Sequence, residues 1–197
     1  MDGQEALSRL RQGMNSLVDA SEELASELFG ICTISHLEKN KQFVRAGTNP
    51  EHVGFNLNGV FRYYYLSSDG TDSTKGFSIP GKFVISYSAM ACRRPSFFSI
   101  EALGEVDILR FKYAEWMRLA ERDARWYKFF FKLVESVYIM KEMREKAFLQ
   151  DDASARYLEF RKDYPGLEDK VRLYHVASFL GITPEALSRV RKDLKLI

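Results

Sequence analysis

The spacing of apolar residues divides the chain into helical and β-rich stretches. Between residues 4 and 29, apolar side chains recur every three or four positions, which predicts helix, and Ser21 followed by two glutamates is typical of a new helical start. From residue 41 to about 112, short runs rich in aromatic and β-branched residues are separated by turn dipeptides such as Asn58-Gly59 and Asp69-Gly70. Evenly separated short strands predict a β-sandwich or barrel rather than an alternating α/β sheet.

A long helical pattern follows the β-rich region and runs from Trp126 to Ala147. One apolar seam has the alternating four- and three-residue spacing of a coiled coil until it reaches the charged Arg144. The seam consists of Trp126, Phe130, Leu133, Val137 and Met140. A second apolar face carries Phe129, Phe131, Val134 and Tyr138. We expect one face to cover the β-rich region and the seam to join two copies in a homodimer. The alternative is a single wide core face within a monomer.

The strongest signal lies near the C-terminus, between Leu173 and Lys192. Ala177 places a small residue where a second helix would cross the first, and Gly181 tolerates the positive φ that a tight turn needs. Thr183 and Pro184 are typical of the cap and first position of the next helix. Five aliphatic residues have the spacing of an inward face: Val176, Leu180, Ile182, Leu187 and Val190. The segment therefore predicts a helix-turn-helix.

The outward face of the second predicted helix is polar. It carries Thr183, Pro184, Glu185, Ser188, Arg189 and Lys192. Arginine pairs with guanine, glutamate accepts from cytosine N4, and serine and lysine contact base edges or phosphates. We expect these six residues to contact double-stranded DNA. An ordinary helical hairpin with a solvated face is the alternative, but it would not require the alanine, glycine, cap and inward residues at matched spacing.

Composition limits the remaining possibilities. The formal charge is only +2 at pH 7, so any DNA-binding charge must be local. No apolar run approaches the roughly 18 residues of a membrane span, and the N-terminus lacks the apolar stretch of a signal peptide, so we expect a cytoplasmic protein without a membrane partner. Cys32 and Cys92 have no CxxC partner, which argues against a zinc site, an iron–sulfur cluster or a disulfide. We expect two buried or half-buried free thiols and no cofactor.

A helix-turn-helix after a β-rich region and a long helix resembles the Crp/Fnr family of regulators, in particular its short Bacteroidetes-type members. The resemblance covers about residues 40 to 197. It rests on Phe61-Arg62-Tyr63-Tyr64-Tyr65 before Asp69-Gly70, on Gly81-Lys82-Phe83-Val84, on the segment from Pro95 to Leu103, and on the segment from Ile182 to Arg189. In the family, the residues that match Glu185 and Arg189 contact bases.

The resemblance implies an α+β fold with a cyclic-nucleotide-binding-like, jelly-roll-like β-roll, which is a double-stranded β-helix. Residues 1–125 would form this sensor domain together with N-terminal helices. Residues 126–150 would form the dimerisation helix, and residues 151–197 a small helix-turn-helix domain. Because only five residues follow Lys192, we expect a β-wing after the recognition helix to be absent or rudimentary.

An effector pocket in the β-roll is also implied by the resemblance. It would lie near Lys82, Phe83, Val84, Arg94 and Ser96. Family members that bind cyclic AMP have a glutamate after the glycine that matches Gly81, and an arginine for the cyclic phosphate. This chain has Lys82 and Ser96 there. Arg93 and Arg94 are close in sequence, and the alternatives for them are a substitute for the missing arginine or, as we expect, a solvated turn. A phosphate in the roll needs a charged partner, so we expect a small-molecule effector other than cyclic AMP.

These patterns predict a DNA-binding transcriptional regulator, not an enzyme, that reads an inverted repeat as a homodimer. A ligand-binding or scaffolding module of the same fold, whose C-terminal hairpin contacts protein, is one alternative. A cupin-like enzyme is another, but it would need clustered histidines as metal ligands. His36, His52 and His175 are dispersed, and the sequence contains no phosphate loop, nucleophile elbow or HExxH motif.

Overall fold

Two short helices open the chain. The computed structural model describes residues 1–196, so Ile197, the last residue of the expected domain 151–197, lies outside the described residues. Helix α1 spans Gly3–Asn15 and α2 spans Glu22–Gly30. Ser21 caps α2, because its hydroxyl accepts a hydrogen bond from the Leu24 amide at 3.2 Å. The helical expectation for residues 4 to 29 is confirmed, with the second start at Ser21.

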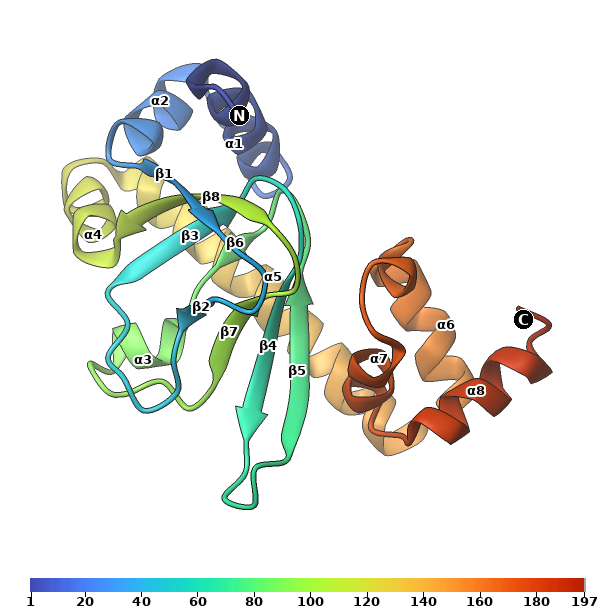
Figure 1. Ribbon diagram of the computed structural model, residues 1–197. Helices are drawn as coiled ribbons and strands as arrows, with labels where there is room; N and C mark the ends of the chain where they lie inside the picture. The colour runs from blue at the N-terminus through green and yellow to red at the C-terminus, as the bar shows by residue number, and fades with distance from the viewer. Residues whose placement is uncertain (197) are drawn as a thin grey trace.

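Eight strands form two antiparallel, four-stranded sheets (Figure 1). The strands are β1 (Thr33–Leu37), β2 (Gln42–Val44), β3 (His52–Asn56), β4 (Phe61–Leu66), β5 (Asp72–Ser78), β6 (Phe83–Val84), β7 (Ser99–Ala102) and β8 (Val106–Lys112). One sheet has the order β1-β8-β3-β6 and the other β2-β7-β4-β5. The α+β fold with a jelly-roll-like β-roll is thus confirmed. Strand β1 lies before the predicted β-rich region. The sequence pattern did not predict it, because this edge strand is mostly exposed and lacks an alternation of apolar and polar residues.

The turn dipeptides of the sequence separate the strands as expected. They are Asn49-Pro50, Asn58-Gly59, Asp69-Gly70, Pro80-Gly81 and Leu103-Gly104. Gly59, Gly70 and Gly81 all have positive φ, which explains why glycine occupies these turns. The interior between the sheets is filled by the chain's own apolar side chains: Val44, Phe61, Val84, Phe98, Ile100, Ala102, Val106 and Ile108.

Three helices accompany the roll: α3 (Tyr87–Ala91), α4 (Tyr113–Arg122) and the long α5 (Ala124–Gln150). The predicted long helix is therefore present, but its expected pairing seam needs a correction. Trp126 is fully buried, and Phe130 and Leu133 pack against the same core, which α1, α2, α4 and the roll build together. The first three seam residues thus face their own chain. Val137 and Met140, further along α5, are exposed.

The C-terminal helices are α6 (Ala153–Asp163), a short 3-10 turn η1 (Leu167–Asp169), α7 (Leu173–Leu180) and α8 (Pro184–Asp193). They form a small unit beyond the end of α5, beside the β-roll (Figure 1). This unit docks on the roll through Phe77 of β5, whose ring lies 5.6 to 6.3 Å from the rings of Phe160, Tyr164 and Phe179. The roll and the C-terminal unit therefore share one apolar cluster.

Candidate nucleic-acid interface

The two helices and the turn predicted between Leu173 and Lys192 are present as α7, Gly181 and α8. Gly181 ends α7 with φ +68°, the left-handed conformation that glycine adopts without strain. Thr183 caps α8, because its hydroxyl accepts from the Ala186 amide at 3.2 Å, and Pro184 occupies the first helical position. The local signals in the sequence thus place the turn and the second helix where the structure has them.

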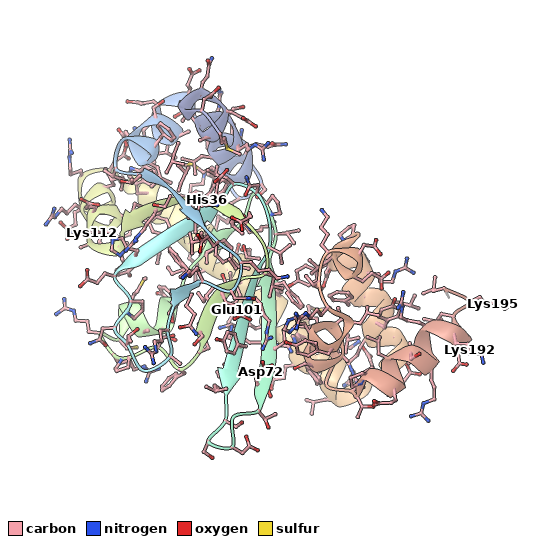
Figure 2. All side chains as sticks on the ribbon, viewed as in Figure 1. His36, Asp72, Glu101, Lys112, Lys192 and Lys195 are labelled. Carbon is pink, nitrogen blue, oxygen red and sulfur yellow. The ribbon has the colours of Figure 1, made fainter. Side chains whose placement is uncertain are left out.

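The two helices separate apolar from polar residues as their spacing predicts. The buried residues between the helices are Val176, Ala177, Leu180, Leu187 and Val190, and Ile182 is half-buried. The residues expected to contact DNA are all exposed: Thr183, Pro184, Glu185, Ser188, Arg189 and Lys192. Lys192, like Lys195 just after α8, projects from the side of the C-terminal unit that faces away from the roll (Figure 2).

The exposed end of α8 carries unpaired positive charge. In residues 1–196, neither Arg189 nor Lys192 forms an ion pair with an acidic side chain. At the other end of α8, the pKa of Glu185 is lowered, mainly by its own backbone N–H and also by the Thr183 hydroxyl and by Arg189. The carboxylate is therefore ionised at neutral pH and free to accept hydrogen bonds from outside the chain.

A polar cluster that the sequence did not reveal joins the roll to α7. Arg62 on β4 is the only charged side chain that is fully buried in the described part of the chain. Its guanidinium pairs with Asp72 on β5 and lies 3.6 Å from Glu101 on β7. It also donates a hydrogen bond to Nδ1 of His175 on α7. Figure 2 places Asp72 and Glu101 on the side of the roll that faces the C-terminal unit.

The environment of His175 keeps its imidazole neutral. Burial lowers the pKa of His175 to about 4, and the charge of Arg62 contributes in the same direction. A neutral imidazole with a bare Nδ1 is the acceptor that the Arg62 donor requires. Burial also raises the pKa of Glu101, whereas Arg62 opposes this shift. Arg62, Asp72, Glu101 and His175 come from positions up to 113 residues apart, so no short sequence motif contains them.

The five residues expected in the effector pocket have mixed surroundings. Phe83 stacks on Trp116 at 5.7 Å in the helical core, and Val84 packs between the sheets. Ser96 is buried, donates to the Phe98 carbonyl at 2.7 Å and lies 2.8 Å from the Ser86 hydroxyl. Its hydrogen-bonding groups are therefore satisfied within the chain.

The two basic residues of the expected pocket, Lys82 and Arg94, are exposed. The Arg94 guanidinium lies 4.6 Å above the Phe97 ring, as expected for a solvated turn. The charged groups of the expected pocket thus lie at the surface rather than inside the roll, whose interior cluster is apolar.

Cysteines and histidines lie apart from one another. Cys32 is half-buried, whereas Cys92 is exposed, which corrects the expectation of two buried or half-buried thiols. His36 contacts Asp107 and Glu105, His52 contacts Arg110, and His175 contacts Arg62. Among residues 1–196, no group of three or more His, Cys, Asp or Glu side chains has the arrangement of a metal site. Within the same range, no helix is long and apolar enough to span a membrane.

Comparison with known proteins identifies the architecture. Residues 34–123 match the family model described as cyclic nucleotide-binding domain. FixK2 from Bradyrhizobium japonicum superimposes with a TM-score of 0.72 at 20% sequence identity, covering 84% of this chain and 85% of that one. The chain has the Crp/Fnr fold. The cyclic-nucleotide-binding-like roll and the overall fold that the resemblance implied are therefore confirmed.

Two further solved structures show the same fold with lower sequence identity. A mutant of CooA from Carboxydothermus hydrogenoformans has a TM-score of 0.68 at 17% identity, covering 94% of this chain and 84% of that one. The c-di-GMP-responsive global regulator CLP of Xanthomonas campestris has a TM-score of 0.65 at 12% identity, covering 87% and 90%. No curated protein matches the sequence.

Proposed function

We propose that this protein is a DNA-binding transcriptional regulator that reads an inverted repeat as a homodimer. The observation that carries the proposal is the exposed face of α8, where Glu185, Ser188, Arg189 and Lys192 lie opposite the buried Leu187 and Val190. A recognition helix needs this division, since its inner face holds the domain together and its outer face enters the major groove. The Crp/Fnr fold of the whole chain supports the same interpretation.

The proposed dimer uses the unpartnered face of α5. Tyr127, Phe131 and Tyr138 are each more than half exposed, and with the half-buried Val134 they repeat at four-, three- and four-residue intervals. This is the spacing of a coiled-coil seam, on the second apolar face of the sequence pattern. Val137 and Met140 are exposed members of the first seam and lie on a neighbouring side of α5, whereas Trp126, Phe130 and Leu133 serve the core. A dimer through α5 would place two recognition helices roughly 34 Å apart, about one turn of DNA.

The β-roll is the proposed sensor of a small-molecule effector. The exposed Lys82 and Arg94 are the charged residues of the expected pocket that a ligand can reach without displacing core side chains. An effector can change DNA binding only if it binds two arrangements of the protein with different affinities. The residues expected near a cyclic phosphate are Ser96, whose hydroxyl is satisfied within the chain, and the exposed Arg94, which favours an effector other than cyclic AMP.

Selection of DNA fragments from a random pool tests the proposal, with Arg189→Ala and Lys192→Ala run in parallel. The wild type should enrich an inverted repeat. Arg189→Ala should cost about 1–3 kcal/mol on that site and relax one base preference, whereas Lys192→Ala should weaken all sequences alike and reduce the salt slope by roughly 1.

Two outcomes would contradict the proposal. One is the absence of enrichment by the wild type even after small molecules from a cell extract are added. The other is binding that hardly changes with salt, because several phosphate contacts make affinity fall steeply as salt rises. Weak salt dependence would favour the alternative in which the C-terminal hairpin contacts protein.

A further inference from the structure

Strand β4 presents opposite faces to the roll interior and to the C-terminal unit. Phe61 and Tyr63 pack between the sheets, as alternate residues of a strand do. Arg62 and Tyr64 point to the other side, where the guanidinium lies 4.5 Å above the Tyr64 ring. Glu101 is directly opposite Arg62 on the neighbouring strand. A position that would be solvent-facing in an isolated roll is thus occupied by a buried arginine.

Three residues on one face of α7 hold this helix to the roll. His175 accepts from Arg62, the Ser178 hydroxyl accepts from the Thr74 amide at 2.8 Å, and Phe179 packs on Phe77. Residues three and four apart share a helix face, so these contacts act on the same side of α7. The opposite side of α7 carries the buried Val176, Ala177 and Leu180 of the C-terminal core. The orientation of α8 relative to the roll therefore follows from the orientation of α7.

Among these contacts, the pair of Arg62 and His175 has the strictest geometric demands. Taking a charge out of water is unfavourable unless its hydrogen bonds are satisfied, and removing one partner of a buried ion pair is strongly destabilising. An apolar contact such as Phe77 with Phe179 tolerates sliding and rotation, because dispersion is not directional. A guanidinium held by Asp72 and Glu101 donates in a fixed direction, so the acceptor on α7 must lie at one place.

We propose that Arg62 is a positioning residue for DNA binding, because its hydrogen bond to His175 fixes the helix-turn-helix in one orientation on the β-roll. In a dimer this orientation sets the separation and direction of the two recognition helices, and hence the half-site spacing that the protein accepts. The inference rests on the proposed function, and it names the contact through which the roll controls DNA reading.

The test compares three histidine variants of the full-length protein. His175→Leu removes the acceptor while Arg62 keeps its two carboxylates, and His175→Gln restores an acceptor oxygen. His52→Leu is the matched control, because His52 also contacts an arginine, Arg110, at 3.0 Å, but wholly within the roll. Each variant is assayed on inverted repeats whose half-sites are separated by different spacers, and by hydrogen exchange of the Thr74 amide and the amides of α7.

His175→Leu should bind a single half-site like the wild type but lose its preference among spacers by about tenfold, the loss expected for one hydrogen bond to a charged group. The Thr74 amide should exchange about tenfold faster, while the amides of β8 exchange at the wild-type rate. His175→Gln should recover most of both effects, and His52→Leu should show neither.

Unchanged spacer preference and exchange in His175→Leu would overturn the inference. Equal losses in His175→Leu and His175→Gln would also overturn it, since packing rather than the hydrogen bond would then be responsible. If the wild type bound no DNA, the proposed function would fail, and hydrogen exchange alone would still decide whether Arg62 orients α7.

Discussion

Replacing Gly181 by alanine tests whether the turn of the helix-turn-helix is fixed by backbone conformation alone or also by α5. Gly181 has φ +68°, and an added Cβ would lie 2.8 Å from Cε1 of Phe148. Gly166, in the same C-terminal unit, has φ +67° but nothing within 4 Å of an added Cβ. Gly166→Ala is therefore a matched control that carries the backbone strain without the steric contact.

The expected destabilisations differ by a measurable amount. A left-handed alanine costs roughly 1–2 kcal/mol, which the lower entropy of the unfolded chain offsets by about 0.4–1 kcal/mol, so Gly166→Ala should cost about 1 kcal/mol. In Gly181→Ala the Phe148 ring must also move away from the guanidinium groups of Arg144 and Arg156, at 4.9 and 5.3 Å. Each such contact contributes about 0.5–1 kcal/mol, so Gly181→Ala should cost about 2–3 kcal/mol in total.

Urea unfolding of the single variants and of Gly181→Ala combined with Phe148→Ala would measure both contributions. In thermal unfolding of the same variants, a chain of this size should lose about 2–4 °C of Tm for each kcal/mol of destabilisation. In the Phe148→Ala background, the cost of Gly181→Ala should fall to that of Gly166→Ala. If Gly181→Ala cost no more than Gly166→Ala, or if its cost did not depend on Phe148, the steric argument would be refuted.

Two further predictions concern the dimer and acid pH. Tyr138→Glu should shift sedimentation velocity from dimer to monomer, because it places a charge in the proposed seam, and an unchanged dimer would exclude that face. Lowering the pH from 7 to 5 should loosen the docking of α7, because histidine in the unfolded chain ionises near pH 6.5 while the pKa of His175 is held at about 4. The stabilisation is complete above pH 6.5 and falls by at most about 2 kcal/mol at pH 5. The raised pKa of Glu101 opposes this loss of stability. Hydrogen exchange of the wild type and of His175→Gln separates the two effects. Equal pH dependence of the two proteins would contradict the assignment to His175.

The positions of α7, its turn and α8 could be predicted from the sequence because the signals for them are local. Thr183, Pro184 and Gly181 act on backbone groups within one turn of a helix, so their positions fix where α7 ends and α8 begins. The turns of the β-roll were predictable for the same reason. Strand β1 was missed because a half-exposed edge strand carries no alternation of apolar and polar residues.

The assignment of the faces of α5 was beyond the sequence, because both faces are apolar. The face that is covered is the one that α1, α2 and α4 pack against, and the residue spacing of α5 alone does not predict that packing. The role of Arg144, a charge that interrupts the expected seam, could not be predicted either, because its partners are distant in the sequence. Arg144 donates to the carbonyl groups of Lys75 at 2.7 Å and of Phe179 at 3.0 Å, so it ties α5 to the roll and to α7.

The junction between the roll and the C-terminal unit combines an apolar and an ionic part, and the two have different consequences. Phe77 packs on the rings of Phe160, Tyr164 and Phe179, an apolar contact that holds the units together without selecting one angle. Arg62 and Arg144 donate to defined atoms of α7, so they do select an angle. A displacement of β4 would break the hydrogen bond from Arg62 to His175 while leaving the apolar contact in place. The C-terminal unit would then stay docked but change its orientation, which is the kind of change that alters half-site spacing without unfolding either part.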